Sequence, residues 1–159
     1  MLTIGKKVAL LVLSANIFST GVAGASIPSD TLVVGGIEYG ASEEYVRSIY
    51  GTPREVETKY NPFYSGGKAV EWEYGNGFDI TFVDGVVRRI EIGEPNGVKT
   101  KANISVGTDV NALFAAYGAP DAIQGDHYIY YVNGDQTIGF VFEIEHNKID
   151  EIEMGTIDR

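Results

Sequence analysis

Regular alternation of apolar and polar residues is the clearest pattern in the chain, and it predicts β-strands. In residues 70–74 and 78–82 the apolar side chains would point to one face of a sheet, and the acids and threonine to the other. Asn-Gly and Asp-Gly pairs at 76–77 and 84–85 are strong signals of tight hairpins. Eight antiparallel strands are therefore expected, at residues 54–59, 68–74, 77–83, 86–92, 121–124, 128–132, 137–145 and 148–154.

Helical spacing of apolar residues replaces this alternation in two short segments, each ahead of a group of four strands. The first helix should begin at Ser42 and the second at Thr108, because both side chains are good N-caps. A Gly-x-Pro sequence at 51–53 and at 118–120 should stop each helix. The apolar stripes consist of Tyr45, Val46, Ile49 and Tyr50 in the first helix, and of Leu113, Phe114 and Tyr117 in the second.

The two helical segments align with each other without a gap at an offset of 67 residues, Gly107 against Gly40. Four identities at fixed spacing indicate an internal repeat. The last two strands of each half also align, at an offset of 62 residues, and share a gap that a bulge would explain. We therefore predict an α+β fold of two tandem repeats, residues 26–96 and 97–159, each a short helix plus an antiparallel four-stranded sheet. The two sheets can join into one continuous curved sheet with the helices on one side.

The first 25 residues have the composition of a secretory signal peptide. Lys6 and Lys7 precede an apolar run at 8–18, and small residues at 23–25 suit cleavage near Ala25. A membrane anchor is the alternative, but the run is short for one, and no later stretch would span a membrane. We expect export to the periplasm or the extracellular space. The chain has no cysteine, which excludes a disulfide framework and a lipid anchor on cysteine.

The acidic charge narrows the classes of partner. Without residues 1–25 the chain has 10 basic and 22 acidic residues, a net charge of −12, since Lys6 and Lys7 leave with that segment. Such a charge disfavours nucleic acid and anionic membrane surfaces as partners, and it suits a basic protein partner. Alternatively, an acidic surface simply keeps an exported protein dispersed.

Residues that could catalyse a reaction do not form a recognisable constellation. His127 and His146 lie away from any serine or aspartate signature, and the strand acids alternate with core residues as a solvated face does. We expect no enzyme activity, catalytic residue, cofactor or metal site. An aromatic-rich loop at 60–67 is the better candidate, because exposed aromatic rings favour protein interfaces, although Tyr60 and Phe63 could instead cap the core. The predicted partner-binding residues are Tyr60, Phe63, Tyr64, His127, Ile129 and Tyr131.

A family likeness is carried by residues 37–53 and 104–120, which both open with Ile-x-x-Gly and close with Gly-x-Pro, and by Phe-x-Asp-Gly-Val at 82–86. The pattern resembles the β-lactamase inhibitory proteins, which have two tandem helix-plus-sheet repeats, and the SmpA/OmlA (BamE-like) family, which has one such unit. The first resemblance implies a non-catalytic exported protein that binds a protein partner through its open sheet face and an aromatic loop. The second implies, as the alternative, an accessory of envelope or outer-membrane assembly. This chain departs from both families in having no cysteine.

Overall fold

A computed structural model describes residues 26–60 and 67–157 of the chain. The helices in this part are a 3₁₀ turn, Ser29–Thr31, and two α-helices, α1 (Glu43–Tyr50) and α2 (Val110–Tyr117). A small hairpin of β1 (Val33–Val34) and β2 (Ile37–Glu38) precedes α1. The remaining strands are β3 (Glu55–Tyr60), β4 (Lys68–Gly75), β5 (Phe78–Val83), β6 (Val86–Ile92), β7 (Ala122–Gln124), β8 (His127–Val132), β9 (Asp135–Glu145) and β10 (Lys148–Thr156).

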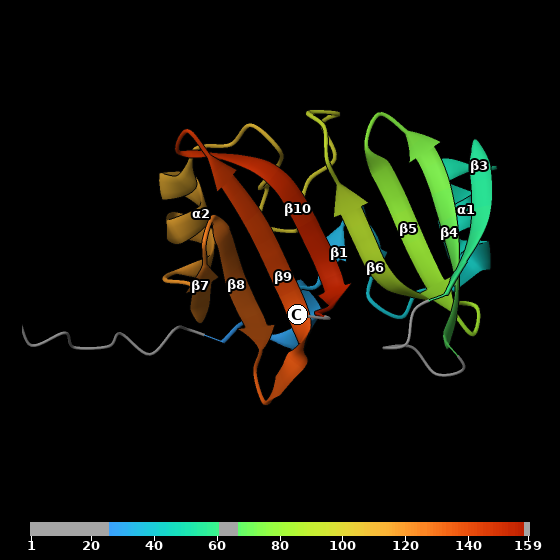
Figure 1. Cartoon of the computed structure of the whole chain (residues 1–159), viewed down its shortest axis with the longest axis horizontal. Helices are drawn as coiled ribbons and strands as arrows, with labels where there is room; N and C mark the ends of the chain where they lie inside the picture. Colours follow the sequence, from blue (N-terminus) through green and yellow to red (C-terminus); the bar gives the residue numbers. More distant parts are fainter. Residues whose placement is uncertain (1–25, 61–66, 158–159) are drawn as a thin grey trace, which may run out of the picture.

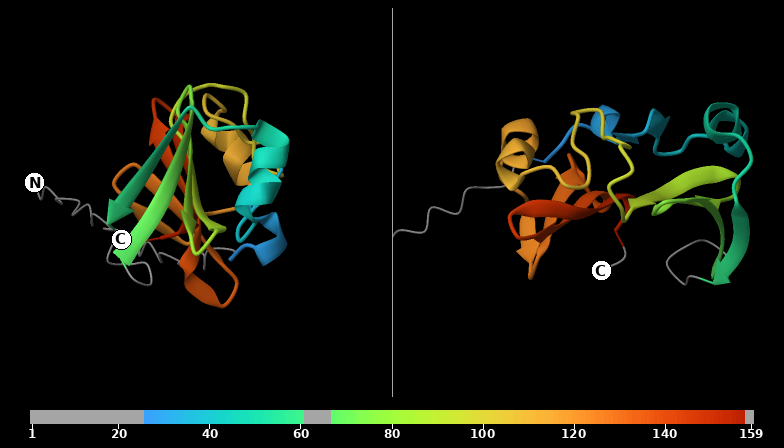
Figure 2. Two further views of the ribbon diagram at one scale, coloured as in Figure 1. Left: turned by 90° about the vertical axis from the view of Figure 1, so that its right-hand side faces the viewer. Right: turned by 90° about the horizontal axis from the view of Figure 1, so that it is seen from above.

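Eight of these strands form one sheet in the order β3-β4-β5-β6-β10-β9-β8-β7, and every neighbouring pair is antiparallel. The four strands after α1 make one half of the sheet and the four after α2 make the other (Figure 1). The last strand of each half lies at the centre, where β6 pairs with β10. Both helices lie on the same side of the sheet (Figure 2). The α+β class and the continuous antiparallel sheet are thus as the sequence predicts.

The hydrophobic core fills the space between the sheet and the elements on its helical side. Trp72 and Phe140, predicted to point inward, are at most 3% exposed there. Tyr117 of α2 packs against Phe140, with the two ring centroids 5.5 Å apart. On β8, Tyr128 and Tyr130 both face this core.

Tight turns and bulges set the register of the strands. Asn76, Asp84 and His146 each have a positive φ of about 50°, as the predicted two-residue hairpins require. The register shifts at Arg88 in β6 and at Asp150 in β10, so that each becomes the extra residue of its strand. Both shifts lie where the sequence predicted a bulge, and that prediction is confirmed.

The start of α1 agrees with the sequence, whereas the start of α2 corrects it. Ser42 accepts a backbone hydrogen bond of 3.1 Å and caps α1. Asp109, not Thr108, caps α2 by accepting from the Asn111 N–H at 2.8 Å. The Thr108 hydroxyl oxygen instead accepts from the Ser105 N–H at 3.1 Å, in the turn before the helix.

The predicted apolar stripes of the helices are only partly buried. Val46 and Leu113 are fully buried, but Tyr45, Ile49 and Phe114 remain exposed. Each helix has eight residues, about two turns, so only its innermost side chains reach the sheet. In the described part of the chain, no helix is long and apolar enough to cross a membrane.

Candidate functional site

A row of carboxylates crosses the sheet on the face opposite the helices. No described helix or strand covers this face (Figure 2). The row follows the strand register, because each acid lies directly opposite the next across a strand pair. Neighbouring strands lie about 4.8 Å apart, so five acids span about 19 Å. We call this row the acidic ladder; its members are Glu55 (β3), Glu73 (β4), Asp79 (β5), Glu91 (β6) and Glu153 (β10).

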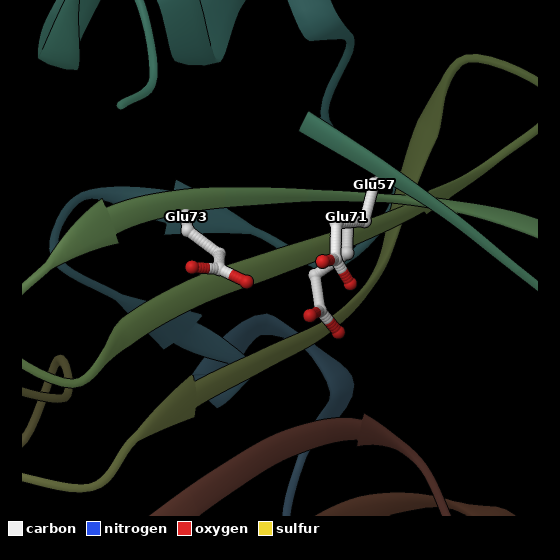
Figure 3. A group of neighbouring side chains, drawn as sticks. All are labelled: Glu57, Glu71 and Glu73. Carbon is white, nitrogen blue, oxygen red and sulfur yellow. The ribbon is translucent and has the colours of Figure 1, made fainter. Parts of the chain in front are cut away.

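More carboxylates lie beside the ladder. Glu57 and Glu71, directly opposite each other on β3 and β4, join Glu73 in a group whose carboxylate oxygens lie within 4.8 Å of one another (Figure 3). Three such oxygens could serve as ligands for a hard cation such as calcium. However, the Lys59 ammonium already contacts the Glu71 carboxylate and lies 3.9 Å from that of Glu57. On β10, Glu151 adds a further acid.

Arg89 is the second basic residue that contacts these acids. Its Nη2 lies 2.7 Å from Glu153 Oε2, with which it forms a hydrogen bond, and 3.6 Å from Glu91 Oε2. Lys59 and Arg89 together face the five ladder acids and three further carboxylates, so the negative charge is only partly compensated. Like charges directly opposite each other on a sheet destabilise it, and the fold tolerates that cost here.

The pKa values of three acids reflect this environment. Burial, then the nearby charges of Glu71 and Glu73, raises the pKa of Asp79 to about 6. Burial, then the charge of Glu91, raises the pKa of Glu151 to about 7. Burial also raises the pKa of Glu91, although Arg89 opposes that shift. The centre of this face therefore holds more negative charge at pH 7.5 than at pH 5.5, and a cation placed there would relieve the repulsion.

A shallow hollow of about 190 Å³ opens among these residues. Ala69, nearly buried, is in its lining, and Lys59, Asp79 and Arg89 also line it. The cross-strand neighbours of Arg89 are Thr81 on β5 and Gly155 on β10, which has no side chain. A Cβ on Gly155 would lie 2.1 Å from the Arg88 carbonyl oxygen, and the φ of +128° also requires glycine. The hollow thus lies over the short side chains of Ala69 and Thr81, between longer charged ones.

Beyond Glu153 the same row becomes apolar. Glu153 lies opposite Val141 of β9, Val141 opposite Ile129 of β8, and Ile129 opposite Ala122 of β7. Val141 is 2% exposed and Ile129 is not exposed at all. The prediction that Ile129 offers an accessible contact is therefore wrong: by strand alternation it lies on the open side of the sheet, but none of its surface is exposed.

The other predicted partner-binding residues lie apart. Tyr60 is 82% exposed at the end of β3 and lies, by strand alternation, on the helical side of the sheet. His127 and Tyr131 lie on β8 on the opposite face. Five strands separate β3 from β8, which places them about 29 Å apart. The structure does not bring these residues into one patch, and Phe63 and Tyr64 lie outside the described residues.

His127 has two acidic neighbours. Its Nδ1 lies 2.9 Å from Asp126 Oδ1, and its Nε2 lies 3.8 Å from Glu143 Oε2. Tyr131 is fixed through its backbone, whose N–H donates to Asp121 Oδ2 at 2.8 Å. Carboxylates of Asp121, Asp126 and Glu143 therefore lie around the apolar end of the open face.

The sequence interpretation missed the acidic ladder. Alternation correctly indicated that acids such as Glu71, Glu73 and Asp79 point away from the core, but they were read as an ordinary solvated face. That they line up across five strands depends on the register and on the central β6–β10 pairing. The signal that could have found the row is the recurrence of acids at outward positions in consecutive predicted strands.

The fold and this face together define an α+β protein with an open, acidic sheet. No protein-family model matches the chain, and no curated protein matches it. Among solved structures, the chain is similar to a crystal structure of an extracellular protein containing an SCP domain from Bacillus anthracis, with a TM-score of 0.53 and 9% sequence identity. The match covers 98% of this chain and 50% of that one, so the chain spans about half the length of that protein. At this identity the similarity concerns the fold alone.

Proposed function

We propose that the chain is a non-catalytic exported binding protein that recognises a basic protein partner through the open face of its sheet. The acidic ladder is the observation that carries this proposal. Five carboxylates in cross-strand register lie on a face that no described helix or strand covers, with Arg89 and Lys59 as partial counter-charge. Basic side chains of a partner would neutralise the negative charge that Arg89 and Lys59 leave uncompensated. The negative charge of the face would also speed the association of such a partner.

The spacing of the ladder favours a helical partner segment. Adjacent ladder acids lie about 4.8 Å apart, which is close to the 5.4 Å rise of one α-helical turn. A helix lying across the strands could therefore set one lysine or arginine against each acid. Basic residues on an extended strand recur about every 6.7 Å and would lose this match after two or three positions.

We also propose that the two halves of the sheet arose by duplication, as in the tandem-repeat inhibitors that the sequence resembles. Each half has a helix followed by four strands. The bulged residues Arg88 and Asp150 are 62 positions apart, which is the offset at which the last two strands of each half align. Export is part of the same proposal. It rests on the composition of residues 1–25 and accords with the extracellular description of the similar Bacillus anthracis protein.

A charge-matched pair of variants tests the site. The first, Glu73→Gln/Asp79→Asn/Glu91→Gln, removes the centre of the ladder. The second, Glu38→Gln/Glu43→Gln/Glu44→Gln, removes the same charge from the helical side. The probe is a fluorescent 15-residue helical peptide with lysine on one face, titrated at low ionic strength. We expect the ladder variant to bind at least about tenfold more weakly than the wild type, a loss of about 1.4 kcal/mol or more.

The helical-side variant should bind within about twofold of the wild type, because it keeps every ladder acid. Equal weakening in both variants would show that the peptide responds to net charge alone, and it would contradict a specific site. Thermal melting of each variant checks that the fold is intact.

A further inference from the structure

Strand β3 forms one edge of the sheet, and among the described strands its only neighbour is β4. All six of its residues are exposed, including two with large apolar side chains, Val56 at 56% and Tyr60 at 82%. Such an edge presents N–H and C=O groups that no neighbouring strand pairs, which makes it a template for another strand. The opposite edge, β7, is only three residues long.

We propose that β3 pairs with β3 of a second copy of this chain, antiparallel about a twofold axis at Thr58. In this register Glu57 lies opposite the partner's Lys59, and Lys59 opposite the partner's Glu57. Val56 lies opposite the partner's Tyr60 on the helical side, so the exposed apolar side chains of the two copies cover each other. Opposite charges and apolar side chains in direct cross-strand pairs both stabilise a sheet.

Charge selects this register over its neighbours. A twofold axis at Glu57 would place the two Glu57 side chains together, and an axis at Lys59 would do the same for the lysines. An axis at Val56 would set Glu55 against Glu57 twice. Residues opposite each other in an antiparallel pair share a face of the sheet. A twofold pair that keeps both open faces on one side must therefore have its axis at a residue, as in these four registers. The axis at Thr58 is therefore the self-complementary one.

This interface adjoins the proposed binding face, because Glu57 and Lys59 lie on the open side of β3. It would place the open faces of both copies on the same side. A six-residue edge buries little area, so the dimer should be weak and reversible. Pairing of β3 with β7 of another copy is the competing arrangement. It is head-to-tail and would produce a growing series of oligomers rather than a closed dimer.

Cysteine cross-linking tests the register sharply, because the chain has no cysteine of its own. Thr58→Cys places two thiols on the axis with Cβ atoms about 5 Å apart, close enough for a disulfide after a small adjustment. Val56→Cys is the matched control on the same strand and face, with its two thiols about 14 Å apart. Under mild oxidation at about 100 µM protein, we expect Thr58→Cys to form mainly linked dimer and Val56→Cys to form at least about tenfold less.

Sedimentation of the wild type over about 10–500 µM should show reversible dimerisation. Glu57→Lys and Lys59→Glu should each weaken the dimer about tenfold or more, and the double exchange should restore it to within about threefold. Thermal melting confirms that each variant folds. A protein that stays monomeric while Thr58→Cys links no faster than Val56→Cys would overturn the proposal. So would a growing oligomer series, faster linkage of Val56→Cys, or a double exchange as weak as the single variants.

Discussion

The two ends of one row of side chains on the open face differ in chemistry, although the same sheet carries both. From β3 to β10 the row is acidic, ending at Glu153, and from β9 to β7 it is apolar, beginning at Val141. On the helical side, by contrast, both halves contribute the same kind of apolar core. The residues of the covered face thus maintain the fold in both halves, whereas the residues of the open face differ between the halves and carry the proposed binding chemistry.

The largest expected effect comes from extending the acidic row into the apolar half. Val141→Glu would bury a carboxylate opposite Glu153, and we expect it to lower the free energy of unfolding by about 3–5 kcal/mol. Thr81→Glu adds an acid in the other half, directly opposite Arg89, and should cost less than about 1 kcal/mol. Urea unfolding measures both. Equal costs would mean that the two halves do not differ as described.

A smaller effect should follow from removing a counter-charge in the acidic half. Arg89→Gln leaves Glu91 and Glu153 without its positive charge, and we expect a loss of about 2 kcal/mol by urea unfolding. Lys99→Gln removes one positive charge from an exposed residue in the linker between the halves, and it should change the free energy of unfolding by no more than about 0.5 kcal/mol. If Arg89→Gln matched this control, the ladder acids would not repel one another appreciably.

The pH dependence of stability should be modest and of a defined sign. The raised pKa values of Asp79 and Glu151, about 6 and about 7, mean that the folded state binds protons more tightly than the unfolded state. The stability that these two acids contribute is fully present below their unfolded pKa near 4, and it is lost as pH rises through the folded values. We expect Tm to rise by about 3 °C when the pH is lowered from 7.5 to 5.5.

The variant Asp79→Asn/Glu151→Gln should remove most of that rise, because both titrating groups are gone. Calorimetric scans at several pH values compare it with the wild type. A wild-type Tm that is constant or falls toward pH 5.5 would contradict the pKa assignments of the acidic half.

Local features of the fold could be predicted from the sequence because short-range chemistry determines them. The hairpin at Asn76, the bulges near Arg88 and Asp150 and the stop of each helix depend on a few adjacent residues, and all agree with the structure. The cap of α2 was assigned to Thr108 instead of Asp109 because two capping residues stand side by side, and only the turn contact of Thr108 separates them.

The candidate site could not be predicted in the same way, because it is a property of long-range pairing. Alternation gives the face on which Glu91 or Glu153 lies, but not that they face each other across the centre of the sheet. It also assigns Ile129 to the outward face without showing that the side chain is buried there. The sequence predicts that Tyr60 and Tyr131 both contact the partner, but it gives neither the strand order nor the distance between the edges of the sheet.

Backbone amide chemical shifts on titration with the lysine-faced peptide test the central claim most directly. We expect the largest changes at the ladder positions of β4, β5, β6 and β10, smaller ones at Val141 and Ile129, and almost none along α1 and α2. The changes should be lost in the Glu73→Gln/Asp79→Asn/Glu91→Gln variant. Changes that concentrate on the helices, or that spread evenly over the surface, would contradict recognition through the open face.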